Sequence, residues 1–150
     1  MNLTGSEIYY AAVTAGIPPP VIGTFSDANY TAPDSAWVAD FHQWFLSTLE
    51  AFGVRDYKPE SGDCDDYADL FASFARLTHR RTSPDCGAAL PVGRFDFALN
   101  PDAAPEARRL HAISWVHTRD QGLIFIEPQT LFRIEKLTAK QIASCTRFSD

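Results

Sequence analysis

Hydrophobic residues recur with two different periods along this chain. In its first half, apolar side chains return every three to four residues, which is typical of amphipathic helices that bury one face. In much of its second half, apolar and polar residues alternate, which is typical of strands whose two faces meet different surroundings. Helices followed by a run of antiparallel strands predict an α+β domain.

A short helix is predicted near the N-terminus. Thr4-Gly5-Ser6-Glu7 has the form of a capping box, in which threonine and glutamate satisfy the first backbone N–H groups. The apolar run that follows ends near Gly16, and three consecutive prolines at 18–20 stop the helix. Residues 21–34 are rich in Ser, Asp, Asn, Thr and Pro and are predicted to form a loop. We therefore expect residues 1–34 to form an extension made of one helix and a Pro-rich loop.

A longer helix is predicted from about Ser35 to Phe52. Asp34 or Ser35 is expected to cap its start, and Gly53 is expected to end it. The face that we expect to be buried consists of Trp37, Phe41, Trp44, Phe45, Thr48 and Phe52. Gln43 lies on the opposite, polar face and is expected to be solvated.

The third predicted helix begins at or beside Cys64. Asp63 or Ser61 can cap it, the acidic residues that follow suit the positive end of the helix dipole, and it ends in the basic turn 79–81. Its expected apolar stripe consists of Tyr67, Leu70, Phe71, Phe74 and Leu77.

Strands are predicted in the second half of the chain. Two of them, at 111–116 and 122–130, form a hairpin around a turn at 120–122. Further strands are predicted at 92–98 and 131–137. A last short helix is predicted from Thr138 through Ile142, and the tail from Cys145 is expected to be the edge of the domain.

Composition restricts the classes of protein to consider. The 150 residues are enough for one domain with a core, and 45% hydrophobic residues indicate a globular chain. The net charge of −6 argues against nucleic acid as a partner. There is no apolar run long enough to span a membrane and no signal-peptide pattern, so we expect a cytoplasmic protein without a membrane partner. Three cysteines, an odd number without short paired spacing, fit a reducing compartment. The oligomeric state stays open.

The position of Cys64 has chemical meaning. Unpaired N–H groups at a helix N-terminus favour a thiolate and can stabilise an oxyanion during acyl transfer. The neighbouring aspartates oppose the thiolate, so a nucleophilic Cys64 needs a basic partner. The predicted hairpin supplies one, because His111 starts one strand and Glu127 lies at the end of the next. Nucleophile, base and carboxylate together form the constellation that cysteine-dependent acyl transfer uses.

These residues resemble a known family. Cys64-Asp65-Asp66-Tyr67-Ala68, His111-Ala112 and Glu127-Pro128-Gln129-Thr130 are similar to the three signatures of transglutaminase-like cysteine peptidases, which belong to the broad papain-like superfamily. The resemblance covers roughly residues 35 to 135. It departs at Glu127, where the family usually has Asp, and again around Ser114-Trp115. A longer carboxylate can still orient an imidazole, and some papain-like fungal lectin protease domains use Glu.

The resemblance implies a fold and an activity. It implies a papain-like or transglutaminase-like core of N-terminal helices packed on an antiparallel sheet, with residues 35–150 as the catalytic domain. It also implies a hydrolase of the thiol protease type, without a cofactor, in which Cys64, His111 and Glu127 form the catalytic triad and a peptide or protein amide is the substrate. Amine transfer in place of hydrolysis stays open, and so does Gln129 as the third member, because residues 127 and 129 share a face of an extended segment.

Two further expectations concern geometry and charge. We expect the Cys64 sulfur to lie within about 4 Å of a ring nitrogen of His111. Papain-like sites usually hold a thiolate–imidazolium pair, and we expect the same here, with Asp65 and Asp66 turned away from the sulfur.

Other interpretations remain. A non-catalytic papain-like domain that serves as a binding or assembly module, for instance in a phage particle, is the alternative from another class. A zinc site built on His111 lacks a short-spaced ligand pair, and the acidic residues near Cys64 lack the pattern of an EF-hand, so we expect no metal. His117, near a turn, is expected to face the solvent.

Overall fold

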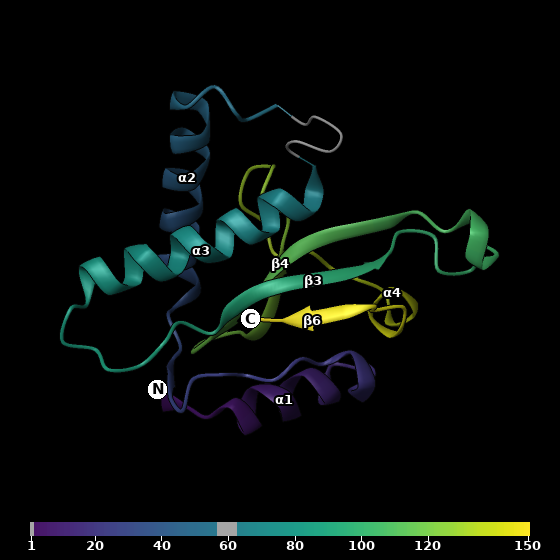
Figure 1. The fold of residues 1–150 in the computed structure, drawn as a ribbon, viewed down its shortest axis with the longest axis horizontal. Coiled ribbons are helices and arrows are strands. Elements are labelled where there is room, and N and C mark those ends of the chain that lie inside the picture. Colours follow the sequence, from purple (N-terminus) through teal and green to yellow (C-terminus); the bar gives the residue numbers. More distant parts are fainter. Residues whose placement is uncertain (1, 57–62) are drawn as a thin grey trace.

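The computed structural model describes residues 2–56 and 63–150 (Figure 1). Its helices are α1 (Gly5–Thr14), α2 (Ser35–Ala51), α3 (Cys64–Thr82) and α4 (Ala139–Ala143), with 3-10 turns at Pro19–Val21 and Pro105–Ala107. Its strands are β1 (Asn2–Leu3), β2 (Tyr30–Thr31), β3 (Val92–Ala98), β4 (Leu110–Thr118), β5 (Gly122–Ile126) and β6 (Arg147–Ser149). Helices α1, α2 and α3 precede all strands of the four-stranded antiparallel sheet, which confirms the predicted α+β class.

The main sheet has the strand order β5-β4-β3-β6, and each neighbouring pair is antiparallel. Strands β4 and β5 form the predicted hairpin, whose ladder runs from Thr118↔Gly122 to Ser114↔Ile126. Gly122 adopts a φ of 69°, a left-handed conformation that glycine reaches without a steric penalty. The long strand β4 therefore lies at the centre of the sheet and carries His111 near its start.

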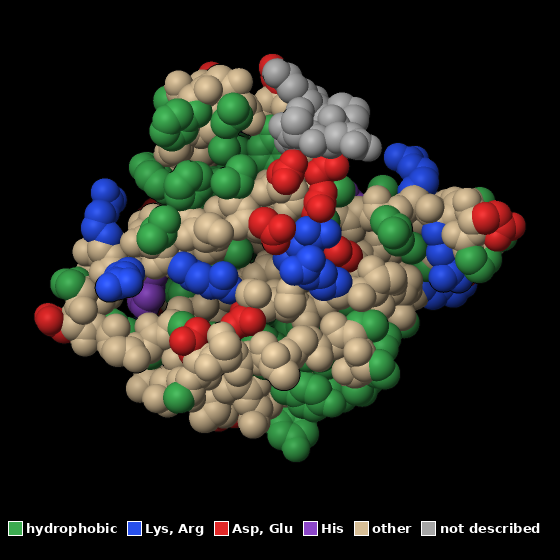
Figure 2. All heavy atoms as spheres, in the orientation of Figure 1, with side chains coloured by type: hydrophobic (Ala, Val, Ile, Leu, Met, Phe, Trp, Pro, Cys, Tyr) green, Lys and Arg blue, Asp and Glu red, His purple; other side chains and the backbone are tan. Residues whose placement is uncertain are grey.

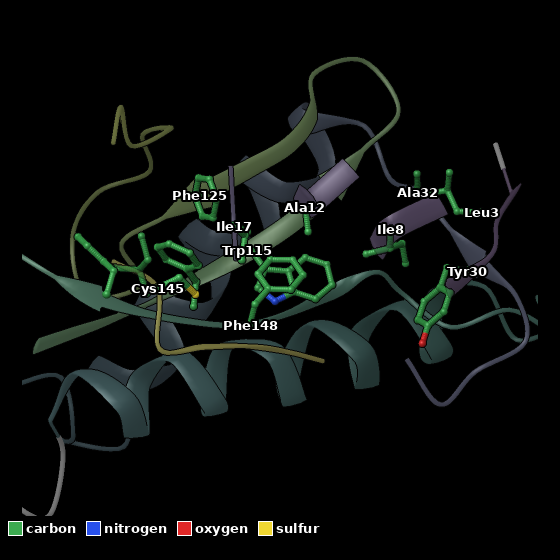
Figure 3. Close-up of a cluster of buried hydrophobic side chains, with 13 residues drawn as sticks. Leu3, Ile8, Ala12, Ile17, Tyr30, Ala32, Trp115, Phe125, Cys145 and Phe148 are labelled. Carbon is green, nitrogen blue, oxygen red and sulfur yellow. The ribbon is translucent and has the colours of Figure 1, made fainter. Parts of the chain in front are cut away.

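The sheet separates two hydrophobic clusters. On one face, α2 and α3 pack against residues such as Val116 and Ile126. On the other face, α1 and the C-terminal segment pack around Trp115 and Phe148, whose rings are stacked 4.6 Å apart (Figure 3). Successive residues of a strand point to opposite faces, so β4 contributes to both clusters and holds the two layers together.

The N-terminal 34 residues supply part of the core. Ile8, Ala12, Ile17 and Tyr30 are buried in the same cluster as Trp115 (Figure 3). The predicted capping box is present, since the Thr4 side chain accepts from the Glu7 amide and Glu7 accepts from the Thr4 amide. The predicted loop 21–34 contains strand β2, which pairs with β1. Thus this segment covers one face of the sheet.

One predicted strand is wrong. Residues 131–137 form no strand and make a single isolated bridge between Ile134 and Ile126. Instead, the tail forms β6, which pairs with β3 from Arg94↔Ser149 to Asp96↔Arg147. The edge of β3 needs a partner for its backbone groups, and the chain end supplies it. Alternation alone does not reveal which of two polar–apolar segments reaches that edge.

The buried faces of the helices are rotated from those predicted. Helix α3 buries Tyr67, Phe71 and three alanines, whereas Leu70 and Leu77 are exposed. Alanine faces the sheet because its small side chain lets helix and sheet approach closely, and the larger leucines then point outward. In α2, Trp44 is 42% exposed instead of buried. Ser61, the alternative cap of α3, lies outside the described residues.

Candidate active site

Cys64 is the first residue of α3. Asp63 precedes it as the N-cap residue with an extended backbone, and its side chain makes no capping hydrogen bond. The amides of the first turn of a helix have no partner within that helix. The sulfur of Cys64, which is partly exposed, therefore lies where backbone N–H groups converge.

The surroundings of Cys64 act on its thiol in opposite directions. Burial raises the pKa of Cys64 above its ordinary value, and the charges of Asp63 and Asp65 raise it further. The backbone amides of Ala112 and of Cys64 itself lower it. Burial is the largest of these causes, so the net shift is upward. This direction opposes the resting thiolate that we expected from the sequence.

Aspartates near Cys64 are held by one arginine. Arg94 of β3 binds Asp96 through two hydrogen bonds of 2.6 and 2.8 Å. Its third nitrogen lies 3.1 Å from both Asp65 and Asp69 of α3. Figure 2 shows acidic and basic side chains gathered together over the N-terminal part of α3. Asp65 thus forms an ion pair with Arg94, while its charge still raises the pKa of Cys64. The expected turning of Asp65 and Asp66 away from the sulfur stays a prediction.

His111 and Glu127 are in direct contact. The Nε2 atom of His111 lies 2.6 Å from Oε2 of Glu127, and both side chains are largely buried. The other oxygen of Glu127 accepts from the backbone amide of Gln129 at 3.3 Å. The carboxylate contact expected for Glu127 is present, and Gln129 contributes its main chain rather than its side chain. Because Nε2 faces Glu127, Nδ1 is the ring nitrogen left for a reacting group.

Strand β4 brings the backbone next to His111 close to Cys64. Helix α3 packs across β3 and β4, and the amide of Ala112, next to His111, acts on the Cys64 thiol. Within residues 63–150, no hydrogen bond joins the sulfur to the His111 ring, so the expected contact of about 4 Å stays a prediction. Catalytic hydrogen bonds are often long in a free enzyme and tighten when substrate binds.

Two histidines are buried although the sequence did not indicate it. His117 is 9% exposed and does not face the solvent as expected, because strand β4 continues to Thr118 and is covered there. His42 of α2 is fully buried, and its Nε2 atom lies 3.1 Å from the carbonyl oxygen of Pro128. Its spacing of four residues from Val38 and three from Phe45, both buried, is the signal that could have placed it on the buried face.

Two adjoining hollows lie beside the Glu127 segment. One, of about 670 Å³, is lined by residues that include Glu50, Arg55 and Gln129. The second, of about 490 Å³, shares Glu50 and Arg55 and continues between α2 and Phe132. Clefts of this size are typical of ligand sites.

None of the helices within residues 2–56 and 63–150 has the length and apolar character that a membrane span needs.

Comparisons with known proteins give one likeness of fold. No family model matches the chain, and no curated protein matches it. Among solved structures, a lectin of Polyporus squamosus, bound to the epitope Neu5Aca2-6Galb1-4GlcNAc, is similar with a TM-score of 0.57 and 17% sequence identity. The likeness covers 99% of this chain and 48% of the lectin chain, so this chain spans about half the length of that lectin. At such identity the likeness shows the fold alone.

Proposed function

We propose that this protein is a cysteine-dependent acyl-transfer enzyme of the papain-like type that hydrolyses amide bonds in peptides or proteins. The observation that carries the proposal is the 2.6 Å contact between His111 and Glu127, next to the amide that acts on Cys64. A histidine held by a carboxylate on one nitrogen has its other nitrogen directed for proton transfer. A cysteine at a helix start on the adjoining element completes the set.

The proposed reaction has two steps. Cys64 attacks the amide carbonyl, its proton passes to Nδ1 of His111, and His111 then protonates the leaving amine as the C–N bond breaks. Water, deprotonated by His111, hydrolyses the acyl-enzyme and restores the thiol. Glu127 accepts a hydrogen bond from Nε2–H of His111 throughout, without taking the proton, and stabilises the imidazolium form. Backbone N–H groups of the first turn of α3 face the developing oxyanion.

The pKa of Cys64 affects the timing of proton transfer. Burial and neighbouring aspartates raise this pKa and so favour the thiol form in the resting site. We therefore propose that His111 removes the proton while the sulfur attacks, as a general base, rather than beforehand.

Exposed Cys86 complicates any thiol assay. Its thiol contacts the Thr31 hydroxyl at 3.4 Å, which lowers the pKa of Cys86. This cysteine is therefore expected to react readily with alkylating agents. The Cys86→Ser variant keeps a polar atom for Thr31 and is the appropriate background. Cys145 is buried, which raises its pKa to about 12. It is therefore expected to contribute little to the measured alkylation.

The test measures both reactivity and turnover in that background. Alkylation of Cys64 by iodoacetamide is followed from pH 5.5 to 9 in the parent and in His111→Ala, and hydrolysis of a peptide library is followed by mass spectrometry. We expect the parent to react faster than His111→Ala at neutral pH, and peptide cleavage to fall by about 10²–10⁴-fold in His111→Ala. Identical alkylation profiles, together with cleavage that survives Cys64→Ala, would refute the proposal.

A second candidate function is a non-catalytic binding module. The fold likeness to half of a lectin chain favours it, since that chain is a carbohydrate-binding protein by name. In that case Cys64 reactivity is independent of His111, and binding of glycans or peptides is unchanged in Cys64→Ala. Glycan-array screening of the parent and of Cys64→Ala distinguishes the two functions.

A further inference from the structure

The carboxylate of Glu127 belongs to a segment that the sheet does not hold. Strand β5 ends at Ile126, and its ladder with β4 stops at the pair Ser114↔Ile126. Pro128, which follows Glu127, has no backbone N–H to donate. The orientation of Glu127 toward His111 therefore depends on contacts other than strand pairing.

His42 supplies such a contact from the layer of helices α2 and α3, which packs on one face of the sheet. It lies on α2, is fully buried, and its Nε2 atom is 3.1 Å from the Pro128 carbonyl oxygen. Pro128 is buried as well, so its carbonyl has to find a donor inside the protein. Because Pro128 O is an acceptor, Nε2 of His42 carries the hydrogen and donates it. The imidazole thus ties α2 to the residue directly after Glu127.

Packing alone does not account for a histidine at this position. The ring lies among aromatic side chains, with Phe71 and Phe132 at centroid distances of 5.5 and 5.8 Å. Its Nδ1 atom is buried and has no hydrogen-bond partner among the described residues. An unpaired buried polar atom destabilises a fold, whereas phenylalanine would fill the same space without that cost. The hydrogen bond to Pro128 is what histidine contributes and phenylalanine does not.

The environment of the His42 ring favours its neutral form. Burial lowers the pKa of His42, and this outweighs the opposing effects of the Pro128 hydrogen bond and of the Glu127 charge. Glu127 is the charged group that acts on the ring, while the neighbouring side chain from α3 is the apolar Phe71. A neutral imidazole with its hydrogen on Nε2 is the form that this hydrogen bond requires.

We infer that His42 is a positioning residue, which fixes the Glu127-Pro128 backbone so that the Glu127 carboxylate meets Nε2 of His111. This role rests on the proposed function. His42 touches no reacting atom and acts through Pro128 and Glu127. Displacing a catalytic group by about 1 Å can reduce turnover by about a hundredfold. Loss of the His42–Pro128 hydrogen bond is therefore expected to lower kcat and to change KM little.

The test compares three variants in the Cys86→Ser background. His42→Phe keeps the volume and removes the donor, His42→Gln keeps a donor near the place of Nε2, and His117→Phe removes a buried histidine elsewhere. Peptide hydrolysis is measured as kcat and KM, and Cys64 alkylation is measured against pH. We expect His42→Phe to lose about 10–100-fold in kcat with little change in KM, and to show reduced His111-dependent alkylation. His42→Gln is expected to recover most of both, and His117→Phe to retain parental values.

The outcomes separate the inference from the proposed function. A parent whose Cys64 reactivity does not depend on His111 overturns the proposed function and this role with it. A parent that depends on His111, combined with parental kcat in His42→Phe, overturns the role of His42 alone. Should His42→Phe fail to fold, His42→Asn is compared with His42→Gln, because its amide ends one bond short of the Pro128 carbonyl. Equal kcat in those two variants also overturns the inference.

Discussion

Arg94 connects helix α3, which begins at Cys64, to the sheet, and its removal should have a large effect on stability. Its side chain is 14% exposed and holds Asp96, which is 16% exposed, through two hydrogen bonds. Removing one partner from a buried ion pair costs about 3–5 kcal/mol, since the other charge is left without compensation. Asp65 and Asp69 are 44% and 55% exposed, so each adds less than about 1 kcal/mol. We expect Arg94→Met to lose about 3 kcal/mol in the free energy of unfolding.

Thermal unfolding measures this loss. For a chain of this size, about 3 kcal/mol corresponds to a decrease of roughly 6–12 °C in Tm. Arg94→Lys keeps the charge without the paired geometry and should fall between the parent and Arg94→Met. The double variant Arg94→Met/Asp96→Asn should recover part of the loss, because the uncompensated carboxylate is gone.

The same substitution should affect the site. Without Arg94, the charge of Asp65 is no longer neutralised, and the pKa of the nearby Cys64 thiol should rise further. Alkylation of Cys64 at pH 7 should therefore be slower in Arg94→Met than in the parent. A Tm within about 2 °C of the parent, together with parental alkylation, would show that Arg94 carries neither role.

Two further predictions concern pH and packing. Burial lowers the pKa of His42, His79 and His117. When the pH falls below the ordinary histidine pKa of about 6.5, these side chains therefore bind protons more readily in the unfolded chain than in the folded chain. Stability should be full above pH 6.5 and fall below it, and the drop in urea midpoint from pH 7.5 to 5.5 should be smaller in His42→Gln; equal drops would contradict this reasoning. Gly93→Ala places a Cβ 2.0 Å from the Ser149 carbonyl oxygen, so we expect a loss of about 1–3 kcal/mol by urea denaturation, and an unchanged midpoint would be evidence against the close packing of β6.

Local signals determined several elements, among them those that carry the site. The capping box before α1, the start of α3 at Cys64 and the hairpin with its turn at Gly122 all depend on residues within a few positions of one another. Helix capping, helical periodicity and left-handed glycine turns are local physics, so a sequence pattern is sufficient to predict them. The placement of His111 near Glu127 followed from the hairpin for the same reason.

Tertiary structure decided which distant groups meet. The hydrogen bond from His42 to Pro128 spans 86 positions, and that from Arg94 to Asp65 spans 29, so no local pattern contains either. Likewise, residues 147–149 and not residues 131–137 pair with the edge of β3, and local sequence does not distinguish these two segments. Which side chain reaches a buried partner depends on how helices and sheet pack, and the free energy of that packing is shared by the whole core. The sequence by itself therefore determined the nucleophile, base and carboxylate as candidates, and only the packed layers determined what orients and surrounds them.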